Sequence, residues 1–323
     1  MDQSYTKKQI AQARSQLYQS IRSFFNSKEY TETETPILSR HLIPESAIEI
    51  FATQLKHPHK EDETLYLTPS PEVYMKALIS EGIGDCYQLT KSFRNAESYS
   101  SRHLIEFTML EWYSMQQNYK DNIETTKNLL QSLAPLAHPQ SRHLFENFSQ
   151  VTMQQLFIDY VDIHLEECQD FSQFKAIASQ KGFSEYAQKS ESWEDLFHFL
   201  FVGHIENKLP DNKTIFVVDY PAQIPTTAKR SGDIYERWEL YMRGWEMANC
   251  YTEETRYSEM QQLFENETVE KNKMMTPHNI DYNYLDIFHH FPQCSGVALG
   301  VDRLFAVFMN LESLADVSLF PQE

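Results

Sequence analysis

The chain has 323 residues, with 46 acidic and 28 basic side chains and a formal net charge of −18. This charge argues against broad binding to nucleic acid, which requires a basic surface that neutralises phosphates. The N-terminus lacks the apolar segment of a secretion signal, and no apolar run is long enough to span a membrane, so we expect a cytoplasmic protein. Four widely spaced cysteines fit a reducing compartment and have neither zinc-knuckle nor redox-pair spacing.

The first third of the chain predicts a helix, several short strands and a second helix. Apolar residues recur every three or four positions between residues 7 and 25, the period of an amphipathic helix. Residues 28–36 predict a turn into a short threonine-rich strand, and 48–55 and 64–68 predict strands around a polar loop. Ser70 and Pro71 predict the start of a helix, as N-cap and first helical residue, and this helix is expected to stop near Gly82 or Gly84.

The remaining elements alternate between strands and helices. Strands are predicted over 87–93, 106–113, 214–220 and 296–301, and a hairpin over 238–251 turns at Arg243 and Gly244. Helices are predicted over 122–133, 149–160, 171–181, 193–208, 258–270 and 302–311, with Ser258 as a possible N-cap.

Hairpin-linked strands interrupted by helices predict an α+β fold, with an antiparallel sheet that has helices on one side. We expect a single domain over residues 1–323. The sequence contains neither a GxGxxG nor a GxxxxGK[ST] loop, so any nucleotide must be bound in another way.

The first candidate cluster lies in the predicted hairpin of residues 87–113. Alternation places Gln88, Thr90, Ser92 and Arg94 on one face, and an arginine at the end of a rigid strand can bind a phosphate with two hydrogen bonds. The return strand places four residues on one face, where a carboxylate and a phenol could orient a polar substrate: Phe107, Met109, Glu111 and Tyr113. The alternative is an ordinary amphipathic hairpin with a surface arginine.

The second cluster is a group of oxygen-bearing side chains, Glu246, Asn249 and Glu253, in an otherwise apolar segment. Carboxylates and amides suit magnesium with bound phosphates, and carboxylates also suit an ammonium group. Strict alternation places Glu246 and Glu253 on opposite faces, so a shared site requires a β-bulge or a loop. The alternative is a strand edge with exposed acids.

The third cluster contains Gly296 and Gly300, two of only eight glycines, followed by Arg303. Glycine in a strand often marks the close approach of a ligand or another backbone, and an arginine at the start of a helix favours an anion. The alternative is a tight packing joint with Arg303 paired to Asp302 or another acid. Taken together, the three clusters fit in-line attack on ATP.

The histidines do not add a metal site to this prediction. His57 and His59, and the pair His289 and His290, have no cysteine or carboxylate at structural-zinc spacing. We expect loop or packing roles for them.

Three segments also resemble a known family. FRNAE…EFTMLEWY and GVALGVDR resemble motifs 2 and 3 of class II aminoacyl-tRNA synthetases of the lysine branch, and ETETPIL, which contains Pro36, resembles motif 1. Within this branch the chain is similar to the elongation factor P β-lysine ligases. The motif 1 helix begins almost at residue 1, so no anticodon-binding domain is expected. Ala298 stands where the synthetases have glycine, which fits a substrate with a shifted amino group such as (R)-β-lysine.

The resemblance implies ATP and Mg²⁺ as cofactors, and it implies roles for individual residues. Arg94, on the ATP α-phosphate, and Arg303, near the adenine and γ-phosphate, are the implied catalytic residues. The implied nucleotide-binding residues are Arg94, Asn95, Glu97, His103, Leu104, Glu246, Met247, Asn249, Gly300 and Arg303. The implied amino-acid pocket consists of Ser70, Pro71, Glu72, Tyr113, Glu253 and Ala298, with Glu72 paired to the substrate ammonium. Glu246 and Glu253 are the implied metal ligands.

This sequence departs from the family pattern at three places. The motif 2 acid is shifted by one residue, to Glu97, and Leu104 replaces an asparagine after His103. Cys250 replaces a glycine beside Asn249, where it is expected to crowd the backbone near the substrate.

The reaction implied by the resemblance has two steps. The carboxylate of a lysine-type amino acid attacks the ATP α-phosphate and releases pyrophosphate, and a lysine of elongation factor P then attacks the adenylate to give an amide and AMP. The resemblance also implies a homodimer formed through motif 1.

Two other interpretations remain open. A related enzyme could load a different acceptor, although the acidic charge and the missing anticodon domain disfavour tRNA. A non-catalytic paralogue that binds amino acid or nucleotide is disfavoured by the presence of Arg94, Glu246, Glu253 and Arg303.

Overall fold

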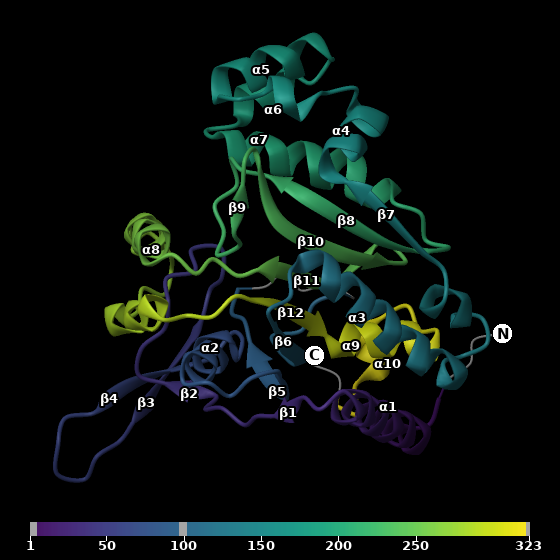
Figure 1. Cartoon of the computed structure of the whole chain (residues 1–323), viewed down its shortest axis with the longest axis vertical. Coiled ribbons are helices and arrows are strands. Elements are labelled where there is room, and N and C mark those ends of the chain that lie inside the picture. The colour runs from purple at the N-terminus through teal and green to yellow at the C-terminus, as the bar shows by residue number, and fades with distance from the viewer. Residues whose placement is uncertain (1–4, 97–101, 321–323) are drawn as a thin grey trace.

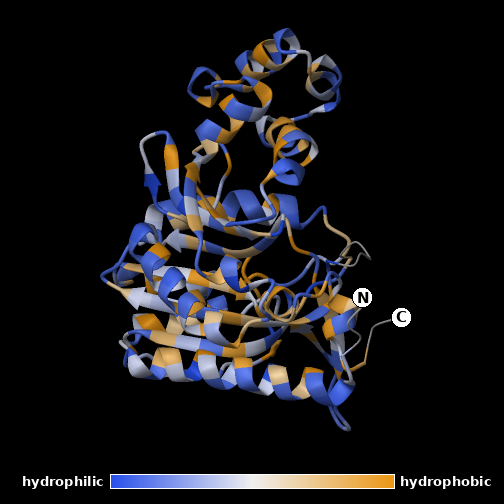
Figure 2. Cartoon of the chain, turned by 90° about the vertical axis from the view of Figure 1, so that its right-hand side faces the viewer, coloured by the Kyte–Doolittle hydropathy of each residue, from blue (hydrophilic) through white to orange (hydrophobic). Residues whose placement is uncertain are grey.

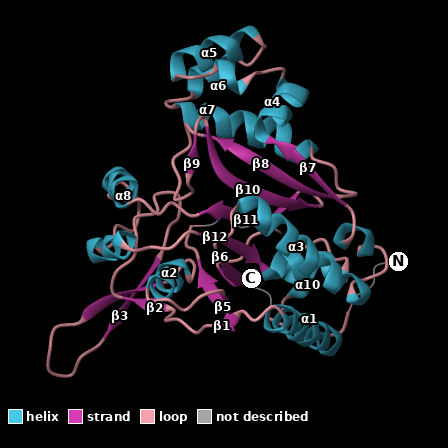
Figure 3. Cartoon of the chain, in the orientation of Figure 1, coloured by secondary structure: helices cyan, strands magenta, loops and turns pink. Residues whose placement is uncertain are grey.

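The structure, a computed structural model, describes residues 5–96 and 102–320, and its centre is a nine-stranded sheet (Figures 1 and 3). The strand order is β1-β5-β6-β12-β11-β10-β8-β7, and β9 pairs with β10. The strands of this sheet are β1 Thr31–Glu32, β5 Cys86–Phe93, β6 Glu106–Met115, β7 Phe148–Thr152, β8 Thr214–Pro221, β9 Arg230–Ser231, β10 Ile234–Met242, β11 Trp245–Thr252 and β12 Cys294–Gly300. The interior pairs are antiparallel, as predicted, whereas β1 pairs in parallel with β5 and β7 with β8.

A smaller sheet and the helices surround this centre. The smaller sheet has the order β2-β4-β3, and its β3–β4 hairpin projects from the body in Figure 3. Its strands are β2 Leu38–Ser39, β3 Phe51–Leu55 and β4 Glu63–Leu67. The helices are α1 Lys7–Ser27, α2 Glu72–Ser80, α3 Tyr119–Leu133, α4 Met153–Val161, α5 Phe171–Gln180, α6 Ser184–Lys189, α7 Trp193–Leu200, α8 Tyr257–Lys271, α9 Val301–Met309 and α10 Leu314–Val317. None of the described helices is both long and apolar enough to cross a membrane.

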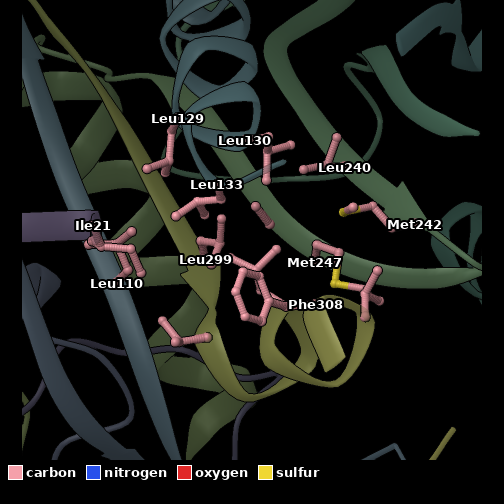
Figure 4. Close-up of a cluster of buried hydrophobic side chains, with 14 of the residues drawn as sticks. Ile21, Leu110, Leu129, Leu130, Leu133, Leu240, Met242, Met247, Leu299 and Phe308 are labelled. Carbon is pink, nitrogen blue, oxygen red and sulfur yellow. The ribbon is translucent and has the colours of Figure 1, made fainter. Parts of the chain in front are cut away.

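One face of the large sheet, the back face, is covered by α1, α3 and α9 (Figure 1). The apolar stripes of these helices meet side chains from six neighbouring strands, among them Leu110, Trp112, Trp238 and Leu299. Figure 4 shows the leucines of α3 and Phe308 of α9 gathered over these strands. Burial of this apolar area supplies the main driving force for folding at about 25 cal/mol per Å².

The opposite, front face is covered only at its two ends. A lobe of α4 to α7, which stands apart from the body in Figure 2, packs on Ile215, Val217 and Tyr241 of β8 and β10. At the other end α2, α8 and the 3-10 helix Tyr282–His289 pack around Cys86, Tyr113 and Cys294. The middle of the front face is left to polar residues. The prediction of helices on one side of the sheet is therefore too simple.

Several predicted boundaries are wrong for local reasons. Residues 148–152 form the edge strand β7, so the predicted helix over 149–160 begins only at Met153, with Thr152 as its N-cap. Ser258 lies inside α8, whose N-cap position is Arg256. The short helix α6 was not predicted.

The hairpin turn at Arg243 and Gly244 is confirmed. Both residues have positive φ, 54° and 67°, which is the backbone that a two-residue hairpin turn with right-handed strand twist requires.

Candidate active site

Cross-strand register assembles a polar strip along the middle of the front face. The neighbours in one row are Gln88, Glu111, Ala298, Asn249 and Glu239, from β5, β6, β12, β11 and β10. Because directly opposed residues share a face, the predicted alternation of β5 and β6 is confirmed and extends over three more strands.

A β-bulge places Glu246 on this strip. In β11, Ala248 pairs with Leu240 and Glu246 pairs with Tyr241, which leaves Met247 as an extra residue. Strict alternation would turn Glu246 away from Asn249, but the extra residue restores it to the same face. The bulge that a shared site required is therefore present.

A cavity of about 190 Å³ opens where β6, β11 and β12 meet the start of α9. Eight of the predicted nucleotide residues line it: Arg94, His103, Leu104, Glu246, Met247, Asn249, Gly300 and Arg303. Ala298, predicted for the amino-acid pocket, lines it too, so the two predicted pockets adjoin.

Two arginines enter this cavity without carboxylate partners in the described part of the chain. Arg94 lies over the Phe107 ring, with its guanidinium carbon 5.4 Å from the ring centroid, and its buried Nε donates no hydrogen bond. Arg303 donates to the carbonyl oxygens of Glu246, at 2.7 Å, and Arg102, at 3.2 Å. Carbonyl groups fix the Arg303 guanidinium but leave its full charge available to an anion.

Asp302, the alternative partner predicted for Arg303, is bound to other groups. This carboxylate accepts a hydrogen bond from Arg14 at 2.5 Å and one from the Thr108 backbone at 2.6 Å. Asp302 thus joins α1, β6 and α9 and does not neutralise Arg303. Of the two predictions for Arg303, an anion site and a pairing with Asp302, the structure favours the anion site.

Glu246 lies between these arginines and a second acid. Burial and the neighbouring Glu239 raise its carboxyl pKa to about 7, while Arg303 and Arg94 oppose that rise. An incoming cation or phosphate-bound metal would stabilise the ionised form. Glu239 is already occupied, since it accepts hydrogen bonds from Arg237 and Tyr241.

Three predictions in this region have other outcomes. The Asn95 side chain donates to Ile50 O at 3.3 Å and accepts from Ala96 N, so it ties the segment after β5 to the residue before β3 and does not line the cavity. Glu97 lies outside the described residues. Cys250 is buried in the back-face core, 3.3 Å from Ser295 Oγ, so it does not crowd the front face as expected.

Beside the cavity lies a cluster of acids with an unexpected cation, which we call the acid-rich pocket because the amino-acid pocket is predicted there. Lys76 Nζ lies 2.6 Å from Glu72 Oε1 and 2.6 Å from Glu253 Oε2, and its side chain is 2% exposed. Glu72 and Glu253 come from α2 and from the end of β11, so the structure brings these two predicted residues together. Burial raises the pKa of Glu253 to about 7, and Lys76 opposes that rise.

Tyr113 and Gly296 shape the floor of this acid-rich pocket. A Cβ on Gly296 would overlap the Tyr113 ring and lie 2.6 Å from Glu253 Oε1, so this glycine is closely approached by side chains, where a ligand or another backbone was predicted. Tyr113 donates to Glu111 Oε1 at 2.7 Å, and Glu111 Oε2 is buried without a partner. Burial and the nearby Glu72 raise the pKa of Glu111 to about 8. Gly300 is not crowded, with its nearest contact at 3.8 Å.

The start of α2 borders the acid-rich pocket. The helix begins at Glu72, one residue later than predicted. Pro71 is buried at the N-cap position with helical backbone angles, and Ser70 Oγ accepts from Glu72 N at 3.4 Å. This local bond sets the direction in which Glu72 leaves the helix.

Several residues here were not predicted as site residues: Glu45, Lys76, Arg237, Glu239 and Tyr284. Glu111 belongs to the first predicted cluster, where alternation placed it on the same face as Tyr113, although the family resemblance gave it no role. Lys76 had only its i+4 spacing from Glu72, and a lysine on a helix is normally exposed. Glu45 lies on a loop, where no periodicity applies; burial and the nearby Glu72 raise its pKa to about 7.

The described residues contain no group of three or more His, Cys, Asp or Glu side chains placed to bind a metal by themselves. Glu253 is paired with Lys76 and not with Glu246. Of the two predicted metal ligands, only Glu246 lines the cavity, so a cation there would take most of its ligands from bound phosphates.

The antiparallel sheet, the motif 2 arginine and the arginine that begins the last long helix together define a class II synthetase catalytic domain. Residues 3–323 match the family of class II tRNA synthetases for aspartate, lysine and asparagine (D, K and N).

Several curated relatives share one name. The chain is 34% identical to the elongation factor P–(R)-β-lysine ligase of Photobacterium profundum, over 97% of this chain and 95% of the relative. It is 34% identical to the ligase of that name in Yersinia enterocolitica, over 95% and 93%, and 33% identical to a homologue in Aquifex aeolicus, over 91% and 93%. The chain therefore belongs to the elongation factor P–(R)-β-lysine ligase family, within the class II synthetases.

Proposed function

We propose that this chain is an ATP-dependent ligase that activates a lysine-type amino acid, (R)-β-lysine in the first instance, and transfers it to a lysine side chain of elongation factor P. The observation that carries the proposal is the pair of arginines, Arg94 and Arg303, whose charges have no carboxylate partner in the described residues and which meet in one cavity. Such preorganised cations stabilise negative charge that develops on a phosphate during attack.

The neighbouring acid-rich pocket is suited to the amine end of the substrate. It holds Glu72, Glu111 and Glu253 against one ammonium, that of Lys76, so the acids exceed the cations by two. A diamino acid brings two ammonium groups and directs its carboxylate toward Arg94. The short distance between the two pockets would align that carboxylate with the α-phosphate, which converts a bimolecular attack into a positioned one.

In this mechanism the protein positions and stabilises, and it forms no covalent intermediate. Arg94 would bind the α-phosphate, and Arg303 would bind the distal phosphates. Glu246 would hold a Mg²⁺ ion together with those phosphates, and the metal would neutralise charge on the leaving pyrophosphate. The acceptor amine would then attack the acyl carbon and displace AMP.

The test is amino-acid-dependent exchange of pyrophosphate into ATP, with α-lysine and (R)-β-lysine offered separately. Faster exchange with the β isomer, followed by labelling of purified elongation factor P at one lysine, is the expected result. Exchange without transfer to that acceptor would leave an activating enzyme with another acceptor. No exchange with any diamino acid would overturn the proposal.

A further inference from the structure

Lys76 is one of two lysines that are completely buried in the described residues, and its place in the acid-rich pocket has no explanation in the reaction itself. The side chain leaves the middle of α2 between Met75 and Ile79, which are in the core. Burial of an ammonium costs several kcal/mol unless charged partners compensate it. A buried lysine is therefore stable at this position only because charged partners compensate the cost of its burial.

Those partners are acids from two separate elements. Glu72 lies one turn earlier on α2, and Glu253 lies just beyond β11, each 2.6 Å from Lys76 Nζ. The contact with Glu253 Oε2 is a close ion pair without hydrogen-bond alignment. One cation thus holds together two carboxylates that would otherwise repel each other and separate.

The groups around Lys76 include further buried polar atoms that Lys76 does not satisfy. Glu111 Oε2 and the Tyr284 hydroxyl are buried and have no hydrogen-bond partner. The other titratable groups that face this region are Tyr113 from β6, Cys294 from β12 and Glu45 from the loop after β2. Buried acceptors without donors usually mark the place of a ligand or a water.

We propose that Lys76 is a positioning residue: its ammonium fixes the separation of Glu72 and Glu253, so that their remaining oxygens, with Glu111 and Tyr284, form a preset cradle for an ammonium group of the amino acid. In this arrangement Lys76 acts through the two carboxylates and not directly on the substrate. This inference rests on the proposed function, since it assigns the amine end of the substrate to the acid-rich pocket.

The test uses the whole chain and the exchange reaction. Lys76→Ala removes three methylene groups and the ammonium, which together have the shape of propylammonium. We expect the KM for the amino acid to rise about 10-fold or more, as for loss of a charged hydrogen-bond partner, while the KM for ATP stays within about two-fold. Added propylammonium should restore much of the loss in the variant and should not improve the wild type.

Lys271→Ala is the matched control. Lys271 is also completely buried, but its Nζ donates to the carbonyl of Ile48 in place of a carboxylate. Its loss should lower stability without a selective change in the amino-acid KM and without rescue by propylammonium. If Lys76→Ala does not fold, as judged by circular dichroism, Lys76→Met keeps the volume and the KM comparison is made on that variant.

The outcomes separate this inference from the proposed function. A wild type that exchanges pyrophosphate, with a folded Lys76 variant whose two KM values are unchanged or rise equally, would overturn the role of Lys76 alone. Failure of propylammonium to improve a folded Lys76→Ala variant would do the same. A wild type without exchange would overturn the proposed function, and this inference with it.

Discussion

At the scale of single residues, Gly296 shows how a missing side chain makes room for a site. Its Cα faces the Tyr113 ring and Glu253 Oε1, and any Cβ would overlap both neighbours. The sequence predicted a close approach at this glycine because it stands in a strand, but it could not tell which side chains approach. Those come from β6 and from beyond β11, more than forty residues away along the chain.

Gly296→Ala should displace Tyr113 and Glu253 while it leaves the nucleotide cavity intact. We expect the amino-acid KM to rise at least 10-fold, because overpacking of a rigid site costs about 1–3 kcal/mol. The KM for ATP should change little. Exchange assays with each substrate varied in turn provide the measurement. Gly203→Ala is the control, since Gly203 lies in the helical turn Phe201–Ile205, does not line the nucleotide cavity, and would place an added methyl group 3.8 Å from its nearest neighbouring atom. A larger effect on ATP than on the amino acid would contradict this account.

Arg303 is the residue whose charge is most directly aimed at a ligand. Its guanidinium is held by two carbonyl oxygens, so its orientation is fixed before any anion arrives. Arg303→Ala should therefore reduce kcat/KM for ATP by about 100- to 1,000-fold, the usual cost of losing one preorganised charge donor. The free energy of unfolding should fall by about 1–3 kcal/mol, the net contribution of two hydrogen bonds.

The control for Arg303 is Arg230→Ala, because Arg230 is exposed and donates only to the turn carbonyl of Gly232. Its activity should match that of the wild type in the same exchange assay. Full activity of Arg303→Ala would remove the main support for the catalytic role of the cavity.

At the scale of elements, the β10–β11 hairpin controls where Glu246 lies. The turn at Arg243 and Gly244 was predictable, because glycine at the second turn position is a strong hairpin signal. The bulge at Met247 was foreseen only as a requirement: no local pattern distinguishes Met247 from its neighbours, and the extra residue becomes evident only through the register with β10.

Gly244 should contribute to stability through its backbone conformation. Its φ of 67° lies in the left-handed region, where a Cβ costs about 1–2 kcal/mol. Gly244→Ala is therefore expected to lower the free energy of unfolding by about 1 kcal/mol, measured by urea titration. Gly203→Ala is the matched control, since Gly203 lies in a helical turn with its nearest atom at 3.8 Å. Equal stability of the two variants would show that this turn tolerates a side chain.

Other elements show where local patterns mislead. Residues 149–152 continue the helical spacing of α4, yet they form the edge strand β7 because β8 offers a parallel partner. Tertiary pairing overrides local propensity in such short segments. The site role of Lys76 could not be predicted for a similar reason. The two acids that it contacts come from different elements, and only the folded chain brings them together.

At the scale of the whole molecule, two separate apolar clusters cover the ends of the front face and leave the acids between them. The α4–α7 lobe buries one end, and α2 with α8 buries the other. The acids between these clusters are largely buried, and their ion pairs with Lys76 and Arg237 compensate only some of them. Four acids consequently have raised pKa values: Glu45, Glu246 and Glu253 at about 7, and Glu111 at about 8.

These pKa values predict that the ligand-free protein loses stability as the pH rises from 6 to 8. In that window an unfolded carboxyl is ionised, whereas Glu111 in the folded chain still holds its proton, so the folded state binds more protons and unfolding becomes easier as the pH rises. Each such group contributes at most about 1.4 kcal/mol per pH unit.

Urea titrations at pH 6 and pH 8 should show this loss of stability, and Glu111→Gln should reduce the loss by about 1–2 kcal/mol because an amide does not titrate. Glu312→Gln removes a carboxyl that is 90% exposed and should leave the pH dependence unchanged. A Glu111→Gln protein with the same pH dependence as the wild type would mean that Glu111 is ionised in the ligand-free pocket, and that a substrate ammonium would meet a full negative charge there from the start.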